Sequence, residues 1–161
     1  MKKQGFTLIE LMVVIVIMGI LAAVAVPKLF GMIAKSKASE VGPAAGTYIK
    51  LQQAYFSEKN QYGGWSVIGY TAPGGSSGTS SATTNFTYGA DNIGATNETN
   101  AGKTGVWTAT NNAKLNDCAS AKNWQIDTKD AAEGGLDGYE AKVNNKTTCL
   151  QLTPNFENIG K

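Results

Sequence analysis

Residues 6–27 read FTLIELMVVIVIMGILAAVAVP, an apolar run in which Glu10 is the only charged residue. As a helix, the stretch from Phe6 to Val26 would be about 31 Å long at ~1.5 Å per residue. That length matches the hydrocarbon core of a bilayer, which is roughly 30 Å thick. A run that is apolar on every face rarely suits a helix in a small soluble domain. The run therefore predicts a membrane-spanning helix.

Charges outside the span predict its orientation. Lys2 and Lys3 precede it and should stay cytoplasmic, which carries the rest of the chain across the membrane. They also supply the whole formal charge of +2, so that a chain without them would be neutral. Beyond Lys59 the 161-residue chain is polar and rich in Gly, Thr, Asn and Ser, which predicts a small soluble head.

The composition argues against several function classes. The chain has no Arg, which supplies bidentate contacts to phosphate and guanine. It has no His, the commonest general base and metal ligand. No nucleophile–base pair or phosphate-binding glycine loop stands out in the sequence. We therefore expect neither catalysis nor a cofactor nor specific binding of nucleic acid.

Glu10 needs a partner. A carboxylate inside an apolar span costs about 3 kcal/mol on insertion scales, and the span contains no Lys or Arg. If the peptide bond after Gly5 is cut, Phe6 gains an α-amino group four residues before Glu10. In a staggered array of parallel helices, Glu10 of one subunit could then meet the Phe6 amine of its neighbour. A Glu10 that is protonated, or that snorkels to the interface, is the alternative.

Residues 5–14, GFTLIELMVV, closely resemble the prepilin signature of type IV pilins and the related pseudopilins. The short basic leader, the Gly before the cut and the Glu five places after it all match. The likeness extends to about residue 60, and beyond it the chain shares only the outline of a pilin head. The resemblance implies cleavage after Gly5 by a prepilin peptidase and N-methylation of Phe6. It also implies that Glu10 supports methylation and the recruitment of subunits.

Gly19 and Pro27 also stand at positions typical of that family. The resemblance implies that the helix can melt between them in a filament. The chemistry agrees, because proline lacks an N–H and glycine gains most entropy when released; a simple kink or close helix packing is the alternative. A signal-peptidase site at Ala23-Val24-Ala25 competes with this interpretation, but an ordinary signal segment should not contain Glu10.

The predicted fold is α+β, with a long N-terminal helix whose second half packs on a small antiparallel sheet of three to five strands. Apolar residues at three- and four-residue intervals predict that the helix continues to about Lys59, and Gly42-Pro43 predicts a bend in it. The packing stripe comprises Val41, Ala44, Ala45, Tyr48, Leu51 and Tyr55. The predicted divisions are a leader at 1–5, a membrane and filament-core helix at 6–27, an amphipathic helix at 28–59, a Gly/Ser/Thr-rich connection at 60–104, and a sheet with a disulfide-bounded C-terminal region at 105–161.

The strands are predicted late in the chain. Residues 106–110 and 124–127 form two of them, and residues 74–81 form a surface loop by composition. Residues 139–143 and 146–152 are predicted to form a hairpin around Asn144-Asn145, with Tyr139 opposite Leu150.

Two further groups of residues suggest sites in the head. Cys118 and Cys149 form an even pair, which favours a disulfide if the head is exported, with two free thiols as the alternative. Such a bond would resemble the family's disulfide-bounded region. Acidic residues around Gly134-Gly135 are weak calcium candidates, because their spacing does not match an EF-hand and a solvated loop explains them better. These acids are Asp127, Asp130, Glu133 and Asp137.

Taken with the resemblance, the sequence predicts a structural subunit of a type IV pilus, major or major-like. The expected partners are copies of itself, the prepilin peptidase and methyltransferase, the inner-membrane assembly machinery, and membrane lipid before assembly. The chain would begin as a single-pass inner-membrane precursor and end in an extracellular filament. A pseudopilin of type II secretion is the nearest alternative, and a membrane-held surface adhesin is a more distant one.

Overall fold

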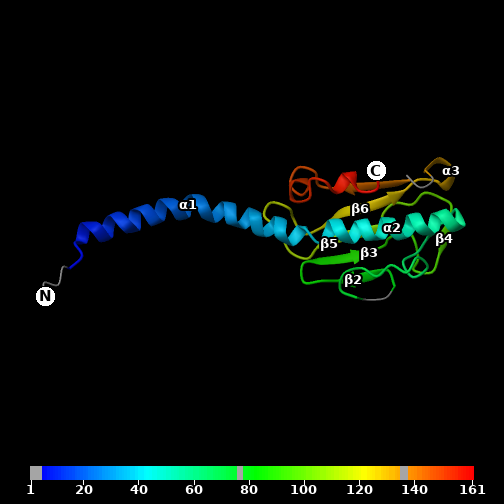
Figure 1. The fold of residues 1–161 in the computed structure, drawn as a ribbon, viewed down its shortest axis with the longest axis horizontal. Coiled ribbons are helices and arrows are strands. Elements are labelled where there is room, and N and C mark those ends of the chain that lie inside the picture. Colours follow the sequence, from blue (N-terminus) through cyan, green and yellow to red (C-terminus); the bar gives the residue numbers. More distant parts are fainter. Residues whose placement is uncertain (1–4, 76–77, 135–137) are drawn as a thin grey trace.

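The computed structural model describes residues 5–75, 78–134 and 138–161. Two helices, α1 (Leu8–Ala38) and α2 (Val41–Lys59), follow one another along nearly the same line. The first projects from the head as a rod, and the second lies across the sheet (Figure 1). The predicted end of the long helix at Lys59 is confirmed, where Asn60 closes α2 in the left-handed conformation.

The bend lies at Ser39 and Glu40, just before the predicted position. Both residues keep right-handed helical angles, so the chain changes direction without turning back. Pro43 falls in the first turn of α2, where a helix does not need the missing N–H. The proline therefore fixes where the second helix begins, and the bend comes before it.

The head is built on an antiparallel sheet of five strands in the order β2-β3-β5-β6-β7, beside a two-stranded sheet of β1 and β4. This confirms the α+β class. The strands are β1 (Tyr62–Gly63), β2 (Ser80–Ala82), β3 (Phe86–Gly89), β4 (Glu98–Thr99), β5 (Trp107–Asn111), β6 (Lys122–Thr128) and β7 (Tyr139–Val143). Short helices follow at α3 (Ala131–Gly134), η2 (Leu150–Leu152) and η3 (Phe156–Asn158).

The connection predicted at 60–104 is more ordered than its composition suggested. It supplies β1 and β4, and it also supplies β2 and β3 of the main sheet. In β3 the alternation is clear, since Phe86 and Tyr88 are buried while Thr87 between them is exposed. A strand of this length is too short for its alternation to stand out from the turn-rich sequence on either side. Its formation depends on its pairing with β5.

Three buried tryptophans centre the core, and each indole N–H has a partner. Trp65 donates to the Val106 carbonyl at 3.1 Å, and Trp107 donates to the Tyr70 hydroxyl at 2.9 Å. Trp124 donates to Thr153 Oγ1 at 2.8 Å. Because these donors are satisfied, the core combines large apolar area with fixed ring orientations.

The face of α2 that packs on the sheet differs from the predicted stripe after Tyr48. Leu51 and Tyr55 are only partly buried, whereas Gln52 is wholly buried. The Gln52 amide donates to the Gly63 carbonyl at 2.5 Å and accepts from the Gly63 N–H at 3.2 Å. This polar side chain therefore ties β1 to the helix, a role that an apolar pattern does not predict. The buried face comprises Val41, Ala44, Ala45, Tyr48, Ile49, Gln52 and Phe56.

The predicted hairpin after β7 is wrong. Asn145 starts a turn, since its carbonyl accepts from the Cys149 N–H at 2.9 Å, and η2 follows instead of a strand. Cys149 is buried. The free edge of β7 is covered from η3, where Glu157 Oε1 accepts from the Val143 N–H at 3.2 Å. A side chain thus satisfies the edge that a strand was expected to pair.

Candidate assembly site on the N-terminal helix

Helix α1 exposes nearly all of its apolar surface. Only Ala34 and Ala38 among its residues are buried. Among the described residues, all nineteen exposed large hydrophobic side chains lie between Phe6 and Ile33. The continuous helical segment from Leu8 to Lys59 contains a stretch long and apolar enough to cross a membrane, and none of that stretch is buried. This surface needs a cover that the chain itself does not provide.

Thr7 and Glu10 form a reciprocal cap at the start of α1. The Thr7 N–H donates to Glu10 Oε2 at 2.9 Å, and the Thr7 hydroxyl donates to the same oxygen at 2.6 Å. The Glu10 N–H in turn donates to Thr7 Oγ1 at 3.3 Å. These contacts satisfy N–H groups that the first helical turn leaves without partners. They also place the carboxylate beside the positive end of the helix dipole.

The cap leaves room for the predicted partner of Glu10. Both Thr7 contacts fall on Oε2, and among the described residues Oε1 has no hydrogen-bond partner. Phe6 is 87% exposed beside it, and Gly5 is exposed as well. The chain can therefore keep its own cap while Oε1 faces outward. Pairing of Glu10 with a neighbour's amine stays a prediction, because it involves a second copy.

Gly19 and Pro27 both lie inside continuous helix. A Cβ on Gly19 would meet nothing within 4 Å, so packing within the chain does not require glycine there. Pro27 interrupts the hydrogen bonding without ending α1. The predicted melting between these positions is absent from this described segment of the single chain, and it stays a prediction for the filament.

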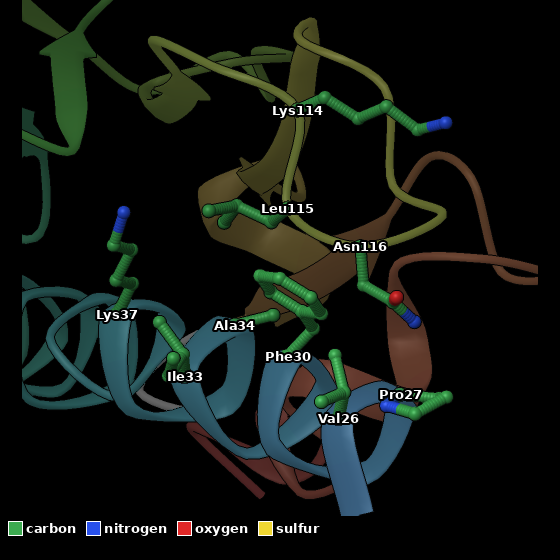
Figure 2. A pocket seen from close by; sticks show the side chains of 9 residues that line it. All are labelled: Val26, Pro27, Phe30, Ile33, Ala34, Lys37, Lys114, Leu115 and Asn116. Atoms are coloured by element: carbon green, nitrogen blue, oxygen red, sulfur yellow. The ribbon is translucent and has the colours of Figure 1, made fainter. Parts of the chain in front are cut away.

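A groove of about 500 Å³ lies where α1 meets the head. One wall is the helix between Val26 and Lys37, and the other is the loop from β5 to β6 (Figure 2). Phe30 points from the helix toward this loop. The lining residues are Val26, Pro27, Phe30, Ile33, Ala34, Lys37, Lys114, Leu115 and Asn116.

The loop wall is held in place from inside the head. Cys118 and Cys149 form the predicted disulfide, and both are fully buried. Leu115 and Cys118 exchange two backbone hydrogen bonds, of 2.9 and 3.0 Å, around a tight turn. Asn111 adds a buried amide that donates to carbonyls on both sides of the loop, Ala113 at 2.9 Å and Ala119 at 3.0 Å. The disulfide therefore fixes the wall that faces α1.

The weak calcium candidates that the structure describes differ in their burial and in their hydrogen-bond partners. Asp127 is buried, and its oxygens accept from the Gly105 N–H at 2.7 Å and from Lys142 Nζ at 2.9 Å. Hydrogen bonds to Asp127 and Glu140 raise the pKa of the Lys142 amine. Asp130 accepts from the Gly102 N–H at 2.6 Å. Asp127 thus serves as a structural anchor between loop and sheet.

The remaining candidates add no ligand set. Glu133 lies exposed on α3, while Asp137 is outside the described residues. Within 5–75, 78–134 and 138–161, no group of three or more Cys, Asp or Glu residues lies close enough to hold a metal ion.

Sequence reasoning missed three features of this region. The Thr-x-x-Glu spacing of Thr7 and Glu10 is itself a capping signature and could have revealed the cap. Glu40 accepts from the Thr83 hydroxyl at 2.7 Å and from the Tyr88 hydroxyl at 2.8 Å, which pins the bend to the sheet. No local signal marks Lys114 as part of a groove, since only the fold brings it near α1.

Comparison with known proteins adds a family match at the N-terminus. The model of the prokaryotic N-terminal methylation motif matches residues 1–26. The chain is 46% identical over 61 residues to the type IV major pilin protein PilA of Myxococcus xanthus (strain DK1622), which covers 38% of this chain and 28% of that protein.

Two further relatives carry similar names. The fimbrial protein EcpC of Eikenella corrodens is 47% identical over 57 residues, covering 35% of this chain and 37% of the relative. The type IV major fimbrial protein FimA of Dichelobacter nodosus is 52% identical over 44 residues, covering 27% and 28%. The aligned part is therefore less than two fifths of each relative. No solved structure matches the chain.

Proposed function

We propose that this chain, a type IV pilin by its N-terminal methylation motif and its likeness to major pilins, is a structural subunit that polymerises into a cell-surface filament. The observation that carries the proposal is α1, which exposes eighteen large apolar side chains and begins with a capped carboxylate. In a filament, copies of this helix cover one another, and the heads face outward. We propose no catalytic role, since the relatives' names describe structural subunits.

Processing would prepare the helix for assembly. A prepilin peptidase would cut between Gly5 and Phe6, and the new Phe6 amine would be methylated. Both residues are exposed and precede the start of α1 at Leu8, so a protease could reach an extended segment there. Glu10 Oε1 would then meet the amine of a neighbouring subunit. Gly19 and Pro27 would permit local unwinding as the helices pack.

Before assembly the chain would be a single-pass inner-membrane protein with a cytoplasmic N-terminus. The apolar segment would lie in lipid, and the disulfide-bonded head would lie across the membrane, where such bonds persist. Lipid and neighbouring helices are both apolar, so moving α1 from one to the other sacrifices little burial. The inner-membrane assembly machinery would carry out that transfer.

The alternatives differ in what they require. A pseudopilin would form a short assembly for protein secretion, but the relatives reported above are named as pilins and fimbrial proteins. A separate adhesin would need a dedicated ligand site in the head. A soluble product released after Ala25 would discard the methylation motif that matches residues 1–26.

A deletion strain tests the function directly. Loss of surface filaments, restored by the intact gene, is the expected result. Loss of enzyme secretion with filaments intact would identify a pseudopilin instead. N-terminal sequencing of the mature subunit should give methylated Phe6, whereas a start at Val26 would refute the proposed processing.

A further inference from the structure

The apolar surface of α1 is longer than the hydrocarbon core of a bilayer is thick. Exposed apolar side chains run from Leu8 to Ile33, about 39 Å at ~1.5 Å per residue. The hydrocarbon core of a membrane is roughly 30 Å. If Glu10 lies near the inner boundary, the turns around Phe30 and Ile33 reach the outer headgroup layer. The groove beside the β5–β6 loop lies at this level of the helix.

The groove combines an apolar floor with positive charge. Val26, Phe30 and Ile33 form the floor, while Lys37 comes from the helix wall and Lys114 from the loop wall (Figure 2). None of the lining residues is acidic.

The acids nearest in sequence to the groove already have partners. Asp117 accepts from the Asn116 amide at 3.3 Å, and Glu40 accepts from two hydroxyls of the head. Among the described residues, neither Lys37 nor Lys114 is in an ion pair, and neither is Lys28 or Lys35 on the same stretch of helix. Four lysines against these two acids leave this end of the head basic as well as apolar.

We propose that, before assembly, the groove binds an anionic phospholipid of the outer leaflet. Its headgroup would be attracted by the positive charges of Lys37 and Lys114, whose amines point away from each other on opposite sides of the groove (Figure 2), and an acyl chain would cover Phe30 and Ile33. The inference rests on the membrane-held stage of the proposed function. A phospholipid has an acyl chain that suits the apolar floor and an anionic headgroup that suits the lysines. A free anion would leave the floor bare, and the 6–27 helix of a second copy would offer the two lysines only Glu10.

Lipid retention by the full chain tests this site. The protein is purified in detergent, exposed to equal amounts of phosphatidylglycerol and phosphatidylcholine, and examined by native mass spectrometry. Phosphatidylglycerol should be retained in preference, by up to about fivefold per lysine at low salt. The preference should weaken as salt screens the exposed amines.

Matched variants locate the effect. Lys37→Gln with Lys114→Gln should abolish the preference, while Lys50→Gln with Lys59→Gln, on exposed positions of α2, should keep it. Ile33→Gln should lower retention of both lipids and leave their ratio unchanged, because it alters the floor alone.

Three results would overturn the site. These are equal retention of the two lipids by the unmodified chain, an equal loss in the α2 control variant, or displacement of phosphatidylglycerol by inorganic phosphate at the same concentration. A chain that inserts into vesicles yet shows no preference contradicts the lipid site and leaves the proposed function standing. A chain that fails to enter vesicles contradicts both.

Discussion

Replacing Glu10 by Gln separates its two roles. The structure gives the side chain a cap contact through Oε2 and leaves Oε1 facing outward. A glutamine oxygen can still accept from the Thr7 N–H, so Glu10→Gln keeps the cap and removes the charge. Thr7→Ala does the reverse, because it removes the hydroxyl that caps the Glu10 N–H and keeps the carboxylate.

The expected sizes of the two losses differ. A missing cap costs about 1 kcal/mol, which corresponds to roughly a fivefold change in an equilibrium. Two unit charges about 4 Å apart attract by about 4 kcal/mol at an effective dielectric constant of about 20, which sets an upper bound on the pairing. Glu10→Gln should therefore reduce filament yield by more than Thr7→Ala does, and the loss in Thr7→Ala should be no more than about fivefold.

The assay is the amount of subunit sheared from cells, measured by immunoblot against the total amount in the membrane. N-terminal sequencing of the membrane pool controls for processing, because an uncut chain has no Phe6 amine. Glu10→Ala removes the charge and the carboxylate's part of the cap, and it should assemble no better than Glu10→Gln. A normal yield from Glu10→Gln, with a strong loss from Thr7→Ala, would refute charge pairing and leave only the cap.

Three further predictions concern the head, each measured on the full chain in detergent. Replacing Cys118 and Cys149 by Ala should lower the unfolding free energy by about 3.7 kcal/mol, the value expected when a disulfide restricts an unfolded chain across a separation of 31 residues. A loss below about 1 kcal/mol would contradict this explanation by chain entropy. Gln52→Leu should lower the unfolding free energy by about 2–4 kcal/mol, because it leaves the N–H and the carbonyl of Gly63 without their side-chain partner. Lys50→Leu, on the exposed face of α2, should change it little. Equal effects of the two substitutions would contradict the role of Gln52. Burial raises the pKa of Tyr70 to about 12, whereas tyrosines in the unfolded chain ionise near 10. As the pH rises, the unfolded chain therefore loses this proton first. The free energy of unfolding should fall by roughly 1.4 kcal/mol per pH unit between about pH 10 and 12. Burial also raises the pKa values of Tyr48, Tyr88 and Tyr139, so urea titrations above pH 10 should show a steep decline, and a flat profile would contradict it.

The N-terminal half was predictable because its signals are local. An apolar run of bilayer length and a helical period decide α1 and most of α2 without reference to distant residues. Even there the sequence misplaced part of the packing face, since Leu51 and Tyr55 are only partly buried and the polar Gln52 is wholly buried. Its partner Gly63 lies eleven residues away on another element. A pattern of apolar residues has no means of representing such a contact.

The fold of the head was harder to predict from the sequence, because it depends on pairing between segments that are far apart in the chain. Strand β3 forms through its register with β5, where Tyr88 faces Ala109. The chain after β7 follows Cys149 into the core instead of returning as a strand. The groove at α1 exists only because the disulfide and Leu115 hold a distant loop against the helix. The alternation in 139–143 was recognised correctly, but its partner is β6 and not the following segment.

Because the exposed surface of α1 is apolar, Glu10 is the residue that can favour the filament over the membrane. Burying its eighteen large apolar side chains is worth about 1.5–3 kcal/mol each, so the helix is not left uncovered in water. Lipid supplies that cover as well as another helix does, and the apolar contacts therefore favour neither the membrane nor the filament strongly. A polar group that finds its best partner in only one of the two environments can then decide between them. Lipid tails offer Glu10 Oε1 nothing, whereas under the proposed processing a neighbouring subunit would bring a cleaved amine. If the proposed function holds, the direction of assembly would depend on cleavage after Gly5, and the large apolar surface would make the transfer nearly free of cost.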